Sequence, residues 1–158
     1  MTPQPLNPAA FRTLAEEEAK VVAAFVQTLH QEQEALTGGQ IDQILPLSEA
    51  KETSCLRLDR FARQRLMLLS ASGITAGASL DSWLAAQEQS VRNAWQALLK
   101  LAEEARNINR QNGQLIASRM QSNSQALNVL LSAADRASLY GPDGQPRTGL
   151  GGRMLGKV

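Results

Sequence analysis

Two side chains of this sequence could act together in catalysis, because a thiolate activated by an imidazole is a nucleophile of acyl transfer. They are His30 and Cys55, the single histidine and the single cysteine of the chain. They stand far apart in the sequence, on segments that we expect to be two different helices. We interpret His30 as a surface side chain and Cys55 as a small thiol facing a core. A catalytic pair of the two is the weakest of three hypotheses.

Other patterns with chemical potential are poorly placed in this chain. The sequence has no Cys-x-x-Cys, no His-x-x-x-His and no clustered aspartates, so we expect no metal site. Residues 149–152 are rich in glycine, but no strand precedes them, and a phosphate-binding loop needs one. The glutamates of 16–18 and 103–104 are interpreted as solvated helix faces. We therefore predict a protein without catalytic residues or a cofactor.

The bulk composition limits the partners. The 158 residues suit one domain, and the net charge of +1 argues against nucleic acid or an anionic membrane surface as the partner. No apolar stretch approaches the roughly 18–20 residues that span a bilayer, so we expect no membrane insertion. The N-terminus lacks the pattern of a secretory signal, and a lone cysteine suits a reducing compartment. The expected location is the cytoplasm.

Helix-forming residues dominate, and the spacing of the apolar ones predicts helices over 8–36, 41–72 and 81–137. Asn7 is placed to cap the first helix, with Pro8 at its first position, and the glycines at 38–39 are placed to end it. Gly73 is the expected end of the second helix. Pro46 leaves two alternatives: the second helix starts there, or an earlier first turn meets a kink.

The second predicted helix carries an apolar stripe that we expect to face the core, made of Cys55, Leu58, Ala62, Leu66 and Leu69. The third segment is much longer, and its first turns could form a separate short helix. A continuous helix of about fifty residues would be about 75 Å long. Two shorter helices can cover only part of that length. The predicted fold is all-α: an antiparallel three-helix bundle or coiled coil with a long C-terminal helix.

Polar residues interrupt the apolar seam of the third helix at Asn112 and Asn123. One interpretation is register control, because a buried asparagine in a helical seam fixes the alignment of the helices. The other is that this half of the helix meets both water and a partner. Gly113 lies nearby in mid-helix, where glycine is unfavourable. It indicates either a close approach by another backbone or compensation by neighbouring residues.

From residue 139 the sequence changes to turn-forming residues and then to a glycine-rich stretch. We expect residues 1–138 to be the helical domain and 139–158 to be a flexible tail that orders on binding, if at all. Tyr140 stands at the junction. It is either a hydrophobic latch at the end of the helix or an exposed aromatic anchor for a partner.

Three segments together resemble the FlgN family of flagellar export chaperones. They are Asn109-Arg110-Gln111-Asn112-Gly113-Gln114-Leu115-Ile116, then Asn123-Ser124-Gln125-Ala126-Leu127, then Leu139-Tyr140-Gly141-Pro142-Asp143-Gly144-Gln145. The resemblance is strongest from about Arg106 to Gln145. The first two predicted helices fit the family in length and pattern, including Lys51 and Arg65.

The resemblance implies a cytoplasmic type III secretion chaperone for the hook–filament junction proteins FlgK and FlgL. Such a chaperone binds the C-terminal segments of its clients and delivers them to the export gate. Carried over by position, the implied client-binding residues lie on the third helix: Asn112, Ile116, Met120, Asn123, Leu127, Leu130 and Leu131. The residues implied to dock on the export gate are Leu139, Tyr140 and Gly141.

A second hypothesis keeps the same seam but changes the partner. In it the chain is a structural coiled-coil protein, whose long helix self-associates into a homo-oligomer without any client. Light scattering with and without a client peptide separates this hypothesis from a chaperone.

Overall fold

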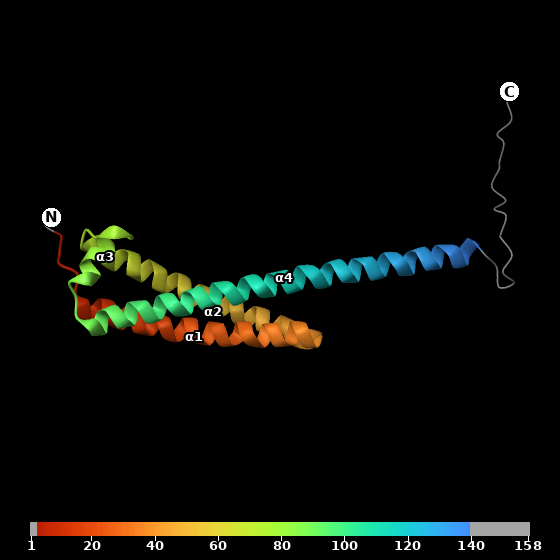
Figure 1. Ribbon diagram of the computed structural model, residues 1–158, viewed down its shortest axis with the longest axis horizontal. Coiled ribbons are helices and arrows are strands. Elements are labelled where there is room, and N and C mark those ends of the chain that lie inside the picture. Colours follow the sequence, from red (N-terminus) through yellow and green to blue (C-terminus); the bar gives the residue numbers. More distant parts are fainter. Residues whose placement is uncertain (1–2, 140–158) are drawn as a thin grey trace, which may run out of the picture. The chain divides into compact units, whose positions relative to one another are not determined.

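The structure, a computed structural model, describes residues 3–139 and shows an all-helical chain over that range (Figure 1). Its elements are α1 (Pro8–Gly38), α2 (Ile41–Ala71), α3 (Ala78–Ala85) and α4 (Gln89–Leu139). The predicted all-α fold is therefore confirmed. The first turns of the third predicted helix are the separate helix α3, which was one of the two expectations for that segment.

The ends of α1 follow from its sequence. The side chain of Asn7 accepts hydrogen bonds from the backbone N–H groups of Ala9, at 2.9 Å, and Ala10, at 3.3 Å. These bonds satisfy two of the donors that a helix start leaves unpaired. At the other end Gly39 takes a left-handed conformation with φ of 70°, which favours glycine. A sharp turn follows, because α2 begins only two residues later.

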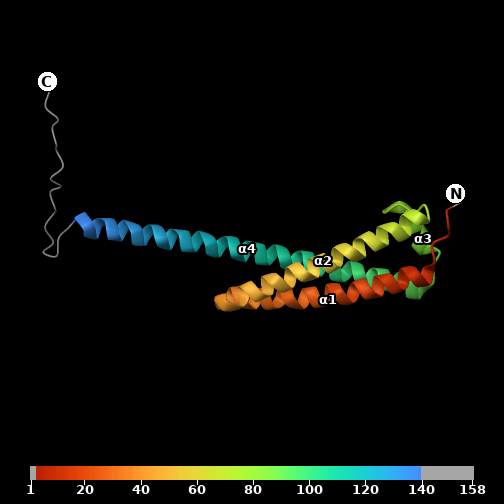
Figure 2. The ribbon, with the colours of Figure 1, turned by 180° about the vertical axis from the view of Figure 1, so that it is seen from behind.

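Helices α1 and α2 lie side by side and antiparallel, joined by this turn, as both views show (Figures 1 and 2). Pro46 lies inside α2, so the helix starts before the proline, at Ile41. The proline has no N–H group to donate, so one hydrogen bond of the first turns is missing there.

The predicted core stripe of α2 is confirmed at Leu58 and Leu69 and wrong at its other three positions. Cys55 is exposed, and Leu66 has 68% of its surface exposed. The half-buried positions follow a heptad pattern that differs from the predicted one: Ile44, Leu47, Lys51, Ser54, Leu58, Phe61, Arg65 and Leu68, with the buried Leu69 next to the last of them. Two of these positions hold cations. Apolar spacing alone could not identify the stripe, because paired basic side chains contribute to it.

The core has two clusters. One joins α1 to the first half of α4 through small and aliphatic side chains, including Val22, Leu29, Leu98 and Ile108. The other gathers at the α3 end, where Phe11 packs edge-on against Trp83 with ring centroids 5.1 Å apart and lies 5.4 Å from Trp95. Both tryptophans are half-buried and pack against this cluster.

The chain divides into two units, Met1–Ile116 and Ala117–Val158. The first holds α1, α2, α3 and the start of α4. In the second, the structure describes only the remainder of α4, and every side chain from 117 to 137 there is exposed. The predicted tail, 139–158, lies outside the described residues apart from the backbone of Leu139, which ends the helix.

Candidate functional site

Buried charges connect α1 to α2 at two levels of the first unit. Glu18, buried on α1, accepts a hydrogen bond from Arg65, whose guanidinium also lies over the ring of Trp95, 5.6 Å from its centroid. Glu32 is 4% exposed and pairs with the ammonium group of Lys51 at 3.0 Å. A buried carboxylate is tolerated only when it is paired and hydrogen-bonded. These two pairs therefore constrain how α1 and α2 align.

The second pair also involves α4. Asn112 is fully buried, and its amide nitrogen donates to the carbonyl of Leu29 and to Oε2 of Glu32, both at 2.8 Å. Lys51 donates to Oδ1 of Asn109 at 3.1 Å. All three long helices thus meet at one polar cluster, formed by Glu32, Lys51, Asn109 and Asn112. Sliding any helix would leave buried polar groups unpaired, which is costly.

Two sequence interpretations change here. Glu18 belongs to a buried pair and not to a solvated face. Asn112 has the bonding expected of a register-fixing residue, and its burial conflicts with its predicted contact with a client. The cluster is the last interior layer before the end of the first unit, because Ile116 is already 36% exposed.

The second unit presents an apolar stripe to solvent. Met120 is 67% exposed, Leu127 57%, Leu130 67% and Leu131 55%. With Asn123, which is also exposed, these residues recur at steps of three and four and so share one face of the helix. We call this set, Met120, Asn123, Leu127, Leu130 and Leu131, the exposed stripe. An apolar face of this kind is the normal contact surface of a helix with another helix.

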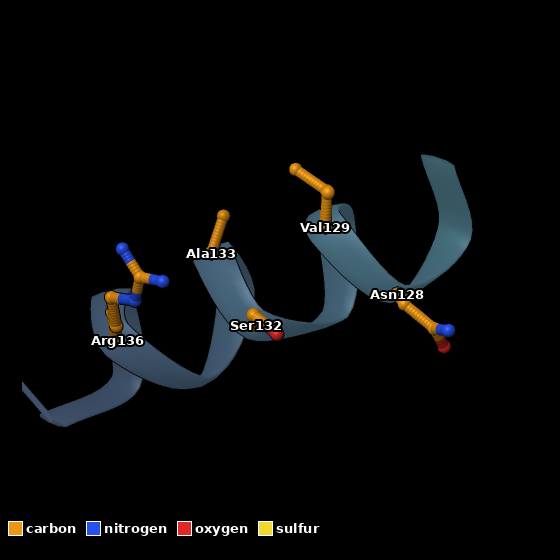
Figure 3. Close-up of a pocket in the computed structure, with 5 residues that line it drawn as sticks. All are labelled: Asn128, Val129, Ser132, Ala133 and Arg136. Carbon is orange, nitrogen blue, oxygen red and sulfur yellow. The ribbon is translucent and has the colours of Figure 1, made fainter. Parts of the chain in front are cut away.

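A shallow hollow lies on the same part of α4. Its described lining is Asn128, Val129, Ser132, Ala133 and Arg136, all from one helix (Figure 3). Val129, Ala133 and Arg136 project on one side of the ribbon in this view, and Asn128 points away. Because a single helix supplies this lining, the hollow is a groove between successive turns. A small-molecule site is normally a concavity that encloses most of its ligand.

Gly113 lies between the polar cluster and the exposed stripe. A Cβ atom added there would meet nothing within 4 Å outside its own helix, so no described backbone approaches it closely. Of the two expectations for this glycine, the structure rules out close approach within the described chain. The glycine lowers helix propensity at the junction of the two halves of α4.

The candidate catalytic residues are not brought together. His30 lies 3.7 Å from a carboxylate oxygen of Glu104, and both side chains are about half exposed. Cys55 is exposed on α2, and no hydrogen bond joins it to His30 in the described chain. Within residues 3–139 no group of three potential metal ligands occurs, and no helix there is long and apolar enough to cross a membrane.

Two surface cations of α1 have pKa values above their usual ones. A hydrogen bond to Glu16 raises the pKa of Arg12, and a hydrogen bond to Glu17 raises the pKa of Lys20. Both pairs join near neighbours on the exposed surface of one helix. Such pairs contribute little to stability and do not mark a reactive site.

Taken together, the described residues define an all-helical protein: a three-helix bundle with buried ion pairs, and an exposed apolar stripe on α4. The sequence model of the FlgN family, described as FlgN protein, matches residues 7–148. The chain belongs to this family of flagellar chaperones and thus to flagellum biogenesis. No solved structure matches the chain.

Individual relatives agree with the family match. The chain is similar to a flagella synthesis protein FlgN of Yersinia enterocolitica serotype O:8, with 29% identity over 92% of this chain and 93% of the relative. It is also similar to a flagella synthesis protein FlgN of Salmonella typhimurium, with 29% identity over 72% of this chain and 74% of the relative.

Sequence reasoning missed the buried ion pairs, although a signal was present. Glu18 and Glu32 are 14 residues apart, and Lys51 and Arg65 are also 14 residues apart. Two heptads separate the members of each pair, so an antiparallel hairpin brings both glutamates opposite both cations. The equal spacing of the two acids and the two bases, together with their opposite charges, could have identified the core-facing side of α2.

Proposed function

We propose that the protein is a cytoplasmic export chaperone that binds the C-terminal segments of hook–filament junction proteins, of the FlgK and FlgL type, and delivers them to the type III export apparatus. The exposed stripe is the observation that carries the proposal. It has the spacing of a helix interface, and every described side chain around it is open to solvent.

The chemistry of the stripe suits an amphipathic helical client. Leucine and methionine side chains offer apolar contact, and methionine adapts its shape to different partners. Leu127, Leu130 and Leu131 are the central contacts in this proposal, with Ile116, Met120 and Asn123 before them in the sequence of α4. A client segment that folds only on binding loses conformational entropy and binds less tightly. Moderate affinity allows release at the export apparatus.

The binding test uses the full-length protein and peptides of the C-terminal segments of FlgK-type and FlgL-type proteins. We expect one peptide to bind per chain, measured by isothermal titration calorimetry and light scattering. The double variant Leu127→Asp with Leu130→Asp should weaken binding by about a hundredfold, because two charges would enter an apolar contact. The matched control is Leu99→Asp, which adds a charge at an exposed leucine of α4 in the first unit. It should bind normally.

The result that would contradict client binding is a wild-type protein that ignores both peptides. If that protein were also a stable oligomer dispersed by the Leu127→Asp and Leu130→Asp changes, the second hypothesis would hold. The long helix would then be a self-associating structural element.

We further propose that Leu139, Tyr140 and Gly141 dock on the export gate. Leu139 is the last residue of α4, and the other two follow it outside the described residues. Tyrosine is a frequent interface anchor. Tyr140→Ala should reduce secretion of the junction proteins in an export assay while leaving peptide affinity unchanged. Equal losses in secretion and affinity would assign Tyr140 to the client instead.

A further inference from the structure

An apolar groove lies between α2 and α4 in the first unit, with α1 at its bottom. The volume of the groove is about 400 Å³. Each helix contributes two apolar residues to its lining: Val22 and Phe25 from α1, Leu58 and Ala62 from α2, and Ala102 and Ala105 from α4. Val22 belongs to the buried core, whereas Ala62 is exposed. The groove is therefore a part of the core that opens to solvent. We call it the α2–α4 groove.

Both walls of the α2–α4 groove are built from short side chains. Ala62 lines it from α2, and Ala102 and Ala105 line it from α4. Where two helices pack closely, side chains of one helix fill the holes between side chains of the other. Alanines on both walls leave this space unfilled. Large apolar side chains from outside the chain therefore have room to enter it.

The apolar stripe that the sequence predicted on α2 follows this groove. Leu58 and Ala62 line the groove, and the exposed Leu66 follows Ala62 one turn later. The spacing of the stripe is that of a helix face that packs against another helix. Within the described chain only part of the stripe is covered. A further helix lying in the groove would cover the rest.

Two opposite charges stand on opposite walls of the groove. Asp59 lines it from α2 and Arg106 from α4, and both are exposed. Asp59 pairs only with Arg63, one turn away on the surface, which is a weak contact, and Arg106 makes no ion pair within residues 3–139. The third charge of the lining, Glu18, is already paired with Arg65. The groove is therefore complementary to a helix with a base on the α2 side and an acid on the α4 side.

We propose that the α2–α4 groove binds a second amphipathic helix of the client, in addition to the C-terminal segment that the exposed stripe binds. This inference rests on the proposed function. The bound helix presents large apolar residues at steps of three and four to the alanines of both walls. Its base lies beside Asp59 and its acid beside Arg106, which fixes the direction of the helix. Binding of this kind places the apolar face of a helix in a groove and completes a four-helix arrangement.

The pattern of α4 supports a client as the occupant. The steps of three and four that include the groove residues Ala105 and Asn109 continue through Asn112 and Ile116 to Met120, the first residue of the exposed stripe. Residues at these steps share one face of a helix. A client that binds the exposed stripe therefore uses the same face of α4 that forms a wall of the groove.

Two linked contacts bind more tightly than either contact alone, because the second forms at a high effective concentration once the first is made. A full-length client offers both segments, whereas its C-terminal peptide offers only one. The full-length client should therefore bind roughly tenfold or more tightly than the peptide. Isothermal titration calorimetry with the full-length protein measures both affinities.

The main test fills the groove in the full-length protein. Ala62→Phe with Ala102→Phe places two rings in the unfilled space. This variant should bind a full-length FlgK-type or FlgL-type client about tenfold more weakly and bind the C-terminal peptide normally. The matched control is Ala97→Phe, at an exposed position of α4 that does not line the groove. It should change neither affinity, and circular dichroism checks that both variants fold.

A second variant tests the charges without adding bulk. Arg106→Glu changes an exposed side chain at the edge of the groove, so the core is not disturbed. It should weaken binding of the full-length client and leave peptide affinity unchanged. The matched control is Arg110→Glu, one turn further along α4 and outside the groove lining. Equal losses in the two variants would indicate a general effect of charge and contradict the proposed role of Arg106.

A photo-cross-link identifies the occupant directly. In a Cys55→Ser background, Ala62→Cys labelled with benzophenone maleimide places a reactive group in the groove. With a full-length client, mass spectrometry should find the cross-link in a client helix outside the C-terminal peptide. The same label at Ala97→Cys is the control and should cross-link far less. A cross-link to the C-terminal segment, or between two copies of the chaperone, would overturn the proposal.

The results also separate this inference from the proposed function. If neither the C-terminal peptide nor the full-length client bound, the proposed function and the groove proposal would both be wrong. If the peptide bound normally, and wild type and the filled variant bound the full-length client equally well, only the groove proposal would be wrong. The Leu127→Asp with Leu130→Asp variant should lose the peptide and retain weak binding of the full-length client through the groove.

Discussion

The two halves of α4 have the same spacing of residues and opposite environments. From Val91 to Asn112 the positions at steps of three and four are buried against α1 and α2. From Met120 to Leu131 the same steps carry apolar residues and Asn123, and all of them are exposed. Periodicity therefore shows where a helix has a contact face, but not whether the contact belongs to the folded chain. A face that continues the core pattern without a core is suited to a partner.

The largest expected effect is the loss of stability on truncating a leucine in the buried half of α4, compared with the exposed half. Leu98→Ala removes a buried leucine that packs against α1, and it should lower the free energy of unfolding by about 2–5 kcal/mol. Leu127→Ala removes an exposed one and should change that free energy by no more than about 0.5 kcal/mol. Urea denaturation followed by circular dichroism measures both. Similar losses would mean that Leu127 is buried in the isolated protein.

A second prediction concerns the polar cluster that closes the buried half. Lys51→Met leaves Glu32 buried without its cation, and it should lower the free energy of unfolding by about 2–3 kcal/mol. The double variant Lys51→Met with Glu32→Met removes the unpaired charge and should recover most of that loss. Thermodynamic coupling between the two substitutions is the measurement. Additive losses would show that the pair does not contribute as a unit.

The smallest effect lies at the junction. Gly113→Ala should stabilise the protein by about 1 kcal/mol, because alanine favours the helix and the added methyl group meets open space. Client affinity should not change. A marked loss of affinity with the helix intact would reveal a client backbone that approaches closely at this glycine.

Much of the fold was predictable from local chemistry. Asn7, Pro8 and the glycine at 39 determine the ends of α1 through capping and a left-handed turn, and these act within a few residues. The core face of α2 was predictable from apolar spacing only at Leu58 and Leu69. Its contacts include Lys51 and Arg65, whose partners, Glu32 and Glu18, lie on another helix. Long-range pairing decides those positions, and hydrophobicity alone also selected the exposed Cys55, Ala62 and Leu66.

The candidate site also has features that the sequence predicted and features that depend on long-range packing. The spacing of Met120, Leu127, Leu130 and Leu131 could be read directly, and the structure places all four on the surface. Asn112 and Asn123 looked alike in sequence, as polar residues in one seam. Only the packing distinguishes them: Asn112 bonds to Leu29 and Glu32 in the interior, while Asn123 is exposed.

Hydrogen exchange along α4, with and without a client peptide, tests the central claim most directly. In the free protein we expect slow exchange of amides in residues 91–112 and fast exchange in residues 117–137, because an exposed helix opens locally with little cost. Adding a C-terminal peptide of a FlgK-type or FlgL-type protein should slow exchange in 117–137 and leave 91–112 unchanged. Slow exchange in 117–137 without the peptide, or no change on adding it, would contradict the account.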